Sequence, residues 1–182
     1  HRGHMALLNR LASTAESDGG ESVVITFHPH PRLVLEKSKK GLSFLTTMEE
    51  KKLLLEKAKI GHLIIINFTH EFSNMSACDF VAEVLVKKLR SKRLIVGYDH
   101  HFGRRGEGDF MTISQCAEYH NLKVEQVQGV YDGLPAISSS GIRKALLNGR
   151  LSDANRWLGY NYTLDGIIIE GRRLGRKLGF PP

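Results

Sequence analysis

The chain alternates between two hydrophobic patterns, one helical and one extended. Apolar residues that recur every three or four positions predict amphipathic helices, at about 4–17, 47–59, 76–89, 112–120, 139–147 and 152–158. Short β-branched and aliphatic runs at 22–27, 63–68, 94–97 and 122–127 predict strands buried on both faces. Thr47 with Glu50 has the spacing of a capping box, and Ser139 is the expected cap of its helix.

The order of these elements indicates the fold class. Strands that alternate with helices of this length imply right-handed crossovers and a parallel sheet covered on both faces. We therefore expect an α/β fold built on a doubly wound parallel sheet. In such folds ligands bind at the carboxyl ends of the strands.

The pattern changes after Gly159. The segment 162–170 predicts β structure, and the rest of the chain is rich in glycine and basic residues without a helical pattern. We expect one domain over 1–159 and the start of a second over 160–182.

Composition narrows the class of protein. The chain has 182 residues with 41% hydrophobic residues, which is ordinary for a globular protein. Its longest apolar runs, such as 63–66, fall far short of the ~20 residues that cross a bilayer, so no membrane segment is expected. Cys78 and Cys116 are too few for a disulfide scaffold and predict idle thiols in a reducing, cytoplasmic environment.

The charge favours an anionic partner. Twenty-six basic against 19 acidic residues give a formal net charge of +7, which attracts nucleic acids and phosphate-rich small molecules alike. No continuous basic stripe is present, which argues against nucleic acid as the partner. A Walker-type phosphate loop is also absent.

The first chemical motif is His1-Arg2-Gly3-His4, directly before a predicted helix. Two histidines three positions apart share a face, and the free N–H groups of the helix start favour a phosphate there. The alternative is a pair of exposed histidines at a frayed end.

The second motif is Ile137-Ser138-Ser139-Ser140-Gly141-Ile142-Arg143, also at a helix start. Its hydroxyls, its free N–H groups and the guanidinium one turn later suit the oxygens of a polyphosphate. A serine-rich cap followed by a solvated arginine is the structural alternative.

Two further motifs follow predicted strands. Thr26-Phe27-His28-Pro29-His30-Pro31 offers a proline-fixed wall and an imidazole to a planar ligand, and no structural metal site is expected there. In the turn Gly97–Gly103, Asp99 can accept a hydrogen bond, and Phe102 can stack on a ligand or pack in the core.

Together the four motifs, in this order, resemble the bacterial bifunctional riboflavin kinase/FMN adenylyltransferase (FAD synthetase) family. The first half of that family is a nucleotidyltransferase of the H-x-G-H type with a Rossmann-like fold. The stretch 166–180 resembles the opening of its β-barrel riboflavin kinase domain, with the kinase motif at Gly171, Gly175, Arg176, Gly179 and Pro181. The resemblance also implies a strand and a glycine-rich turn before His1.

The resemblance implies an enzyme that transfers AMP from ATP to FMN, giving FAD and pyrophosphate, with Mg²⁺ bound mainly through the ATP phosphates. His1, His4 and Arg143 would be catalytic, and the ATP site would comprise Gly3, His4, Asp99, Ser138, Ser139, Ser140 and Arg143. The flavin site would comprise Pro29, His30, Pro31, Asp99 and Phe102.

The sequence departs from the family pattern at some positions. Ser140 stands where the family has threonine, and Pro182 stands where its kinase has a threonine. The resemblance also implies riboflavin as a substrate of the longer parent, and neither nucleic acid nor membrane as a partner. The alternatives are another H-x-G-H adenylyl- or cytidylyltransferase and a basic nucleic-acid-binding module.

Overall fold

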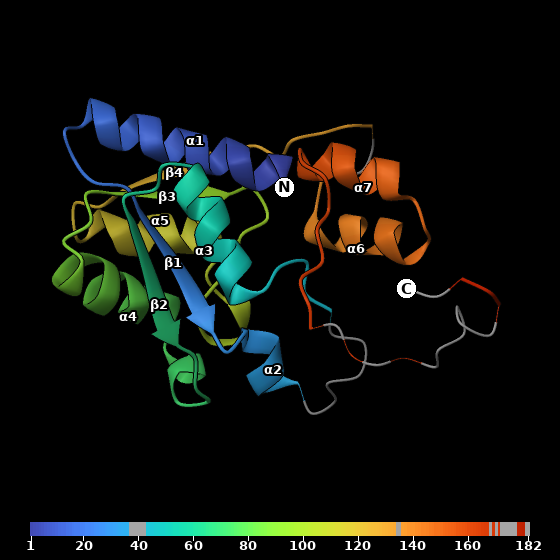
Figure 1. Ribbon diagram of the computed structural model, residues 1–182. Helices are drawn as coiled ribbons and strands as arrows, with labels where there is room; N and C mark the ends of the chain where they lie inside the picture. The colour runs from blue at the N-terminus through green and yellow to red at the C-terminus, as the bar shows by residue number, and fades with distance from the viewer. Residues whose placement is uncertain (37–42, 134–135, 168, 170, 172–177, 181–182) are drawn as a thin grey trace.

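A computed structural model of the chain describes residues 1–36, 43–133, 136–167, 169, 171 and 178–180. Strands alternate with helices along the chain (Figure 1). The strands are β1 (Val23–His28), β2 (His62–Asn67), β3 (Arg93–Gly97) and β4 (Lys123–Val127). The helices are α1 (Arg2–Ser17), α2 (Pro31–Leu35), α3 (Met48–Lys57), α4 (Ala77–Asp79), the π-helical η2 (Phe80–Lys88), α5 (Phe110–Glu118), α6 (Ser139–Leu147) and α7 (Leu151–Leu158), with short turns η1 (Phe72–Asn74) and η3 (Arg104–Gly106).

The four strands form two parallel pairs. β1 pairs with β2 from Val23 opposite His62 to His28 opposite Asn67, and β3 pairs with β4 from Arg93 opposite Lys123 to Gly97 opposite Val127. The α/β class with parallel strands is therefore confirmed. The expected single sheet is not present among the described residues, because β1 and β3 do not hydrogen-bond to each other.

The strand pairs lie between two layers of helices. Alternate side chains of all four strands pack on one side against the buried cluster of η2 and α5, whose members include Val81, Leu85 and Ile113. On the other side Arg10 of α1 is paired with Glu125 of β4. Side chains of a strand alternate between faces, so this arrangement is consistent with a Rossmann-like fold.

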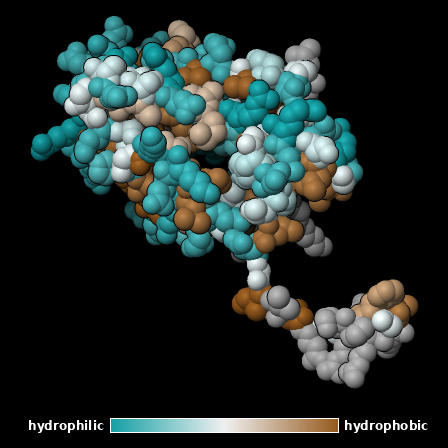
Figure 2. Space-filling view, turned by 45° about the horizontal axis from the view of Figure 1, so that its top comes forward, coloured by the Kyte–Doolittle hydropathy of each residue, from teal (hydrophilic) through white to brown (hydrophobic). Residues whose placement is uncertain are grey.

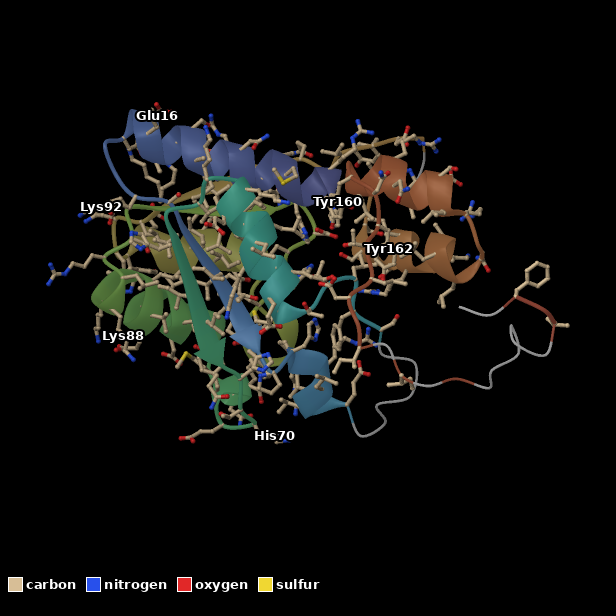
Figure 3. The ribbon with its side chains drawn as sticks, viewed as in Figure 1. Glu16, His70, Lys88, Lys92, Tyr160 and Tyr162 are labelled. Atoms are coloured by element: carbon tan, nitrogen blue, oxygen red, sulfur yellow. A yellow bond between two sulfur atoms is a disulfide. The ribbon has the colours of Figure 1, made fainter. Side chains whose placement is uncertain are left out.

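A second, smaller core joins α6 and α7. Ile142, Ala145, Ala154 and Leu158 are almost completely buried against one another. Tyr160 and Tyr162, labelled in Figure 3, follow α7 and pack against this cluster. The chain immediately after α7 is therefore held on the same body as the helices before it.

Two helix starts test the capping predictions. Thr47 and Glu50 form the expected capping box of α3, with the Glu50 N–H donating to Thr47 Oγ1 at 3.1 Å. At α6 the cap is Ser138, whose Oγ accepts from the Gly141 N–H at 3.2 Å. The prediction of Ser139 was wrong by one residue, because Ser139 already has helical geometry and leaves the capping position to Ser138.

Two further sequence expectations need correction. The glycine-rich, charged stretch 103–109 is typical of a mobile loop, but it is folded closely against the start of α4, where a Cβ at Gly103 or Gly108 would meet Ala77 atoms at 2.6 Å. Cys78 and Cys116 are joined as a disulfide across α4 and α5, with their Cα atoms 5.3 Å apart. The two thiols are therefore paired because helix packing brings them together, which spacing along the chain does not reveal.

The last part of the chain shows no strand among its described residues, so the β structure expected over 162–170 is not seen at 162–167 and 169. Several apolar side chains here are largely exposed, and Figure 2 shows some of them apart from the main body; they include Leu164, Ile167, Ile169, Leu178 and Phe180. Gly175, Arg176 and Pro181 of the kinase motif lie outside the described residues, whereas Gly171 and Gly179 are within them. In the described part of the chain, no helix has the length and apolar character needed to cross a bilayer.

Candidate functional site

The first histidine motif forms the beginning of α1. The ring of His1 caps the helix, since its Nδ1 accepts from the backbone N–H of His4 at 3.1 Å. The His1 and His4 rings stack with their centroids 3.9 Å apart. An Nδ1 that accepts is unprotonated, so a neutral His1 keeps Nε2–H as a donor. The expectation that the two imidazoles share a face is confirmed.

The electrostatic setting keeps His4 neutral. Burial, then the positive charges of the N-terminal amino group and of Lys51, lower the pKa of His4 from 6.5 to about 4. The residue as a whole is nevertheless exposed to solvent. At neutral pH His4 therefore presents an uncharged imidazole that can donate one hydrogen bond.

The second motif begins α6 and provides a permanent cation. Arg143 donates from Nη1 to Ser140 Oγ at 3.3 Å, and its buried Nε has no hydrogen-bond partner in the described part of the chain. A buried donor without a partner is uncommon, because leaving it unsatisfied costs about 1–3 kcal/mol. Arg143 is thus suited to donate hydrogen bonds to an anionic oxygen of a ligand.

The starts of α1 and α6 lie side by side. A Cβ on Gly3 would stand 3.4 Å from the carbonyl oxygen of Ile137 and 3.2 Å from the His1 ring. A residue with a side chain at position 3 would therefore displace the ring that caps α1. The glycine brings the two motifs together although 133 or more positions separate them in the sequence.

The third motif lies at the carboxyl end of β1. His30 caps α2 through Nδ1, which accepts from the Arg32 N–H at 3.2 Å, and its ring lies 5.0 Å from that of Phe44. Burial is the largest cause of a lowered pKa at His30, followed by the positive charges of Lys51, Arg32 and Arg143. The charge of Arg143 in the second motif therefore acts on the ring of the third. Pro29 and Pro31 flank His30 in this turn.

The fourth motif follows β3 and approaches α1 from the other strand pair. Asp99 Oδ1 and Leu7 Cδ1 both lie within 4 Å of the Cβ position of Gly97. Leu7 is one helical turn beyond His4, so the Asp99 turn borders the first histidine motif. The Phe102 ring packs edge-on against the Phe80 ring, with their centroids 5.3 Å apart. The centroid of the His100 ring lies 5.7 Å from that of Phe102. The core interpretation of Phe102 therefore holds, and its flavin role stays a prediction.

Sequence reasoning missed Lys51. This residue lies on α3, and its Nζ donates to Thr26 Oγ1 of β1 at 3.2 Å. A lysine in an amphipathic helix ordinarily indicates a solvated face. The available signal was its position, since Lys51 precedes Leu54, Leu55 and Ala58 at helical spacing and so occupies the apolar stripe.

Two surface hollows of the structure lie away from the predicted site residues. One hollow of about 420 Å³ lies between α5 and β4, and one of about 380 Å³ lies between α3 and β2. No predicted site residue lines either hollow. Among residues whose placement is described, no group of three His, Cys, Asp or Glu side chains could hold a metal ion.

Comparison with known proteins agrees with this arrangement. The FAD synthetase family profile matches residues 1–141. Several curated proteins named bifunctional riboflavin kinase/FMN adenylyltransferase are similar to this chain. The one from Listeria monocytogenes is 34% identical to it, over all of this chain and 57% of the relative. The relatives in Buchnera aphidicola and Escherichia coli K12 are each 33% identical over all of this chain and 58% of their own length.

A solved structure extends the similarity to three dimensions. A crystal structure described as a macrolide-efflux protein from Streptococcus pneumoniae superimposes with a TM-score of 0.85 at 27% identity, over all of this chain and 58% of that one. The chain thus spans somewhat more than half the length of the proteins it matches. The profile match, the identities and the four motifs agree, and the chain belongs to the FAD synthetase family.

Proposed function

We propose that this chain is an FMN adenylyltransferase of the H-x-G-H type, which transfers AMP from ATP to FMN and releases pyrophosphate. The observation that carries the proposal is the adjacency of the α1 and α6 starts at Gly3 and Ile137. Two helix N-termini, neutral imidazoles and the Arg143 guanidinium then surround one space. Such donors suit a polyphosphate.

The reaction needs positioning and charge stabilisation. A phosphate oxygen of FMN attacks the α-phosphorus of ATP, a new P–O bond forms, and the bond from the α-phosphorus to the bridging oxygen breaks. The electron pair of that bond leaves with pyrophosphate. No protein group becomes covalently attached, so preorganised donors aimed at the developing charge account for catalysis.

We assign the residues as follows. His1 and His4 donate to the ATP phosphates around the α-phosphorus, next to the backbone at Gly3. Arg143 holds the pyrophosphate part with the hydroxyls at 138–140. Asp99 lies between the nucleotide and the flavin, which Phe102 and the Pro29-His30-Pro31 turn border.

Magnesium would arrive with ATP as part of the substrate. Mg²⁺ prefers oxygen ligands and commonly binds through substrate phosphates and few carboxylates. The donors of this site are mainly nitrogen atoms and hydroxyls, with Asp99 as the carboxylate among the predicted site residues. The donor set therefore fits an ion carried by ATP rather than one held in a protein cage.

The longer parent protein is proposed to be bifunctional. Residues 1–159 would form the adenylyltransferase domain, and 160–182 would begin a β-barrel riboflavin kinase domain that phosphorylates riboflavin to FMN. The names of the relatives support two activities in the longer parent. We place the protein in the cytoplasm on the basis of its proposed substrates, since the argument from idle thiols no longer holds.

The test is FAD formation from ATP and FMN, followed chromatographically together with pyrophosphate release. Replacing His4 by alanine should lower the rate by ~10²–10³, the usual cost of removing a donor to a developing charge. The His120→Ala variant, changed at an exposed histidine after α5, should retain the parent rate.

The assay also separates the alternatives. Pyrophosphate release with pantetheine phosphate or nicotinate mononucleotide, but not with FMN, would indicate another H-x-G-H transferase. Steeply salt-dependent binding to DNA or RNA without FAD formation would indicate a nucleic-acid-binding module. A His4→Ala rate within a few-fold of the parent would contradict the role of His4.

A further inference from the structure

Lys51 on α3 points inward, toward β1. The capping box at Thr47 fixes the first turn of the helix, and Lys51 lies one turn later. Lys51 is half-buried, as are Leu54 and Leu55 along the same face, whereas its neighbour Lys52 is exposed. The hydrogen bond from Lys51 to Thr26 shows that this face of α3 is turned toward β1.

The ammonium group of Lys51 is held but not neutralised. Its Nζ donates to the hydroxyl of Thr26 at 3.2 Å. No ion pair between Lys51 and a carboxylate occurs among the described residues. An ammonium has three N–H donors, so two remain for a ligand. A half-buried charge without a counter-ion is costly, and an anion bound beside it would remove that cost.

Lys51 is held beside the strand that leads into the third motif. Its hydrogen-bond partner Thr26 is two residues before His28 at the end of β1. The positive charge of Lys51 also lowers the pKa of His4 on α1 and the pKa of His30 after β1. The charge of the lysine therefore acts on a histidine of the proposed ATP side and on one of the proposed flavin side.

We propose that Lys51 binds the phosphate of FMN and directs it toward the α-phosphorus of ATP. This inference rests on the proposed function and adds a positioning residue for the attacking group. The assignment to FMN follows from the distribution of charge. The proposed ATP site already has Arg143 and two helix N-termini, whereas the side chains assigned to the flavin site, which include the Asp99 carboxylate, contain no lysine or arginine.

The chemical benefit is a reduction of repulsion. The attacking phosphate and the phosphates of ATP are both anionic, and like charges a few ångströms apart repel strongly where water is partly excluded. A fixed ammonium between them offsets this repulsion and orients the attacking oxygen. Lys51 forms no covalent bond and transfers no proton in this role.

The test compares FMN with a flavin that has no phosphate. In steady-state FAD formation, Lys51→Met should raise the KM for FMN by ~10–100-fold, the loss expected for a charge-assisted contact. The inhibition constant of lumiflavin, which lacks the phosphate, and the KM for ATP should change by less than about threefold. Lys51→Arg should recover most of the affinity for FMN, and Lys52→Met on the exposed face should match the parent.

Two independent readouts support the comparison. Thr26→Val removes the hydroxyl that holds Nζ and should raise the KM for FMN severalfold with little change in lumiflavin inhibition. In Lys51→Met the pKa of the His30 ring, followed by NMR, should rise because a nearby positive charge is gone. Thermal unfolding of each variant shows whether it is folded.

The outcomes separate the two proposals. If the parent protein forms no FAD, the proposed function fails. If the parent forms FAD and Lys51→Met keeps the parent KM for FMN, only the role of Lys51 fails. Equal weakening of FMN and lumiflavin would indicate a structural role, and a change confined to the KM for ATP would assign the lysine to the other substrate; either result overturns the inference.

Discussion

The helices α1 and α6 begin beside each other, yet their starts are built from different chemistry. At α1 the cap is the His1 imidazole, and His4 follows with a pKa lowered to about 4. At α6 the cap is the Ser138 hydroxyl, and Arg143 follows one turn later. One start thus offers neutral donors, and the other offers a charge that persists at every physiological pH.

This difference suggests how a polyphosphate would be divided between them. Pyrophosphate carries most of the charge that develops in the transfer, so a permanent cation serves best at its position. Around the α-phosphorus, neutral donors stabilise the transition state without holding the anionic ground state too tightly. Each of the following substitutions alters the start of α1 or the start of α6.

Among the three effects considered next, the largest is expected at the charged start of α6. Arg143→Ala removes the guanidinium that we assign to the departing pyrophosphate, and kcat/KM for ATP should fall by roughly 10². The exposed neighbour Lys144 provides the control, since Lys144→Ala changes the same helix and the same net charge. Equal losses in both variants would show that general positive charge, rather than the position of Arg143, matters.

A smaller effect is expected at the cap of α6. Ser138→Ala removes the oxygen that accepts from Gly141, and the free energy of unfolding should decrease by about 1 kcal/mol. Ser139→Ala should cost less, because Ser139 lies inside the helix. Urea denaturation at neutral pH measures both values. A larger loss of unfolding free energy in Ser139→Ala than in Ser138→Ala would show that Ser139 is the cap, as the sequence predicts.

The smallest effect concerns pH and the neutral start. The pKa of His4 is about 4 in the folded chain and near 6.5 when unfolded. The unfolded chain therefore takes up the proton first, so this contribution to stability is complete above pH 6.5 and is lost as the pH falls toward 4. Because His4 is partly exposed, the loss should be on the order of 0.5 kcal/mol.

Urea denaturation at pH 7 and pH 5 tests this dependence. The His4→Gln variant should lose less stability than the parent over that interval, while His120→Gln should follow the parent. An unchanged decline in His4→Gln would assign the acid sensitivity to other groups.

The sequence predicts local structure well where neighbours in the chain determine it. The capping box at Thr47 and Glu50 and the parallel pairing of the strands follow from side-chain pattern and element order alone. The expected burial of the strands on both faces was wrong for β2, where Ile65 is 41% exposed. Ligands are also expected at the carboxyl ends of the parallel strands, which the third and fourth motifs follow. The adjacency of Gly3 and Ile137 brings the other two motifs together.

Features that depend on distant contacts were not predicted. The bond between Cys78 and Cys116 requires knowledge of how α4 and α5 pack. Lys51 was overlooked because a lysine in a helix is usually solvated, and the contact with Thr26 shows its inward direction. The separation of the strands into two pairs likewise reflects hydrogen bonding that chain order does not specify.

The disulfide between Cys78 and Cys116 makes the intervening chain a closed ring. The bond spans 38 positions, and the ring includes η2, β3 and the turn with Asp99. A single proteolytic cut anywhere inside this ring would leave both products attached to each other. Such a nicked protein would migrate as one species until a reductant is added. The turn with Asp99 could therefore be cut without either part of the chain being released.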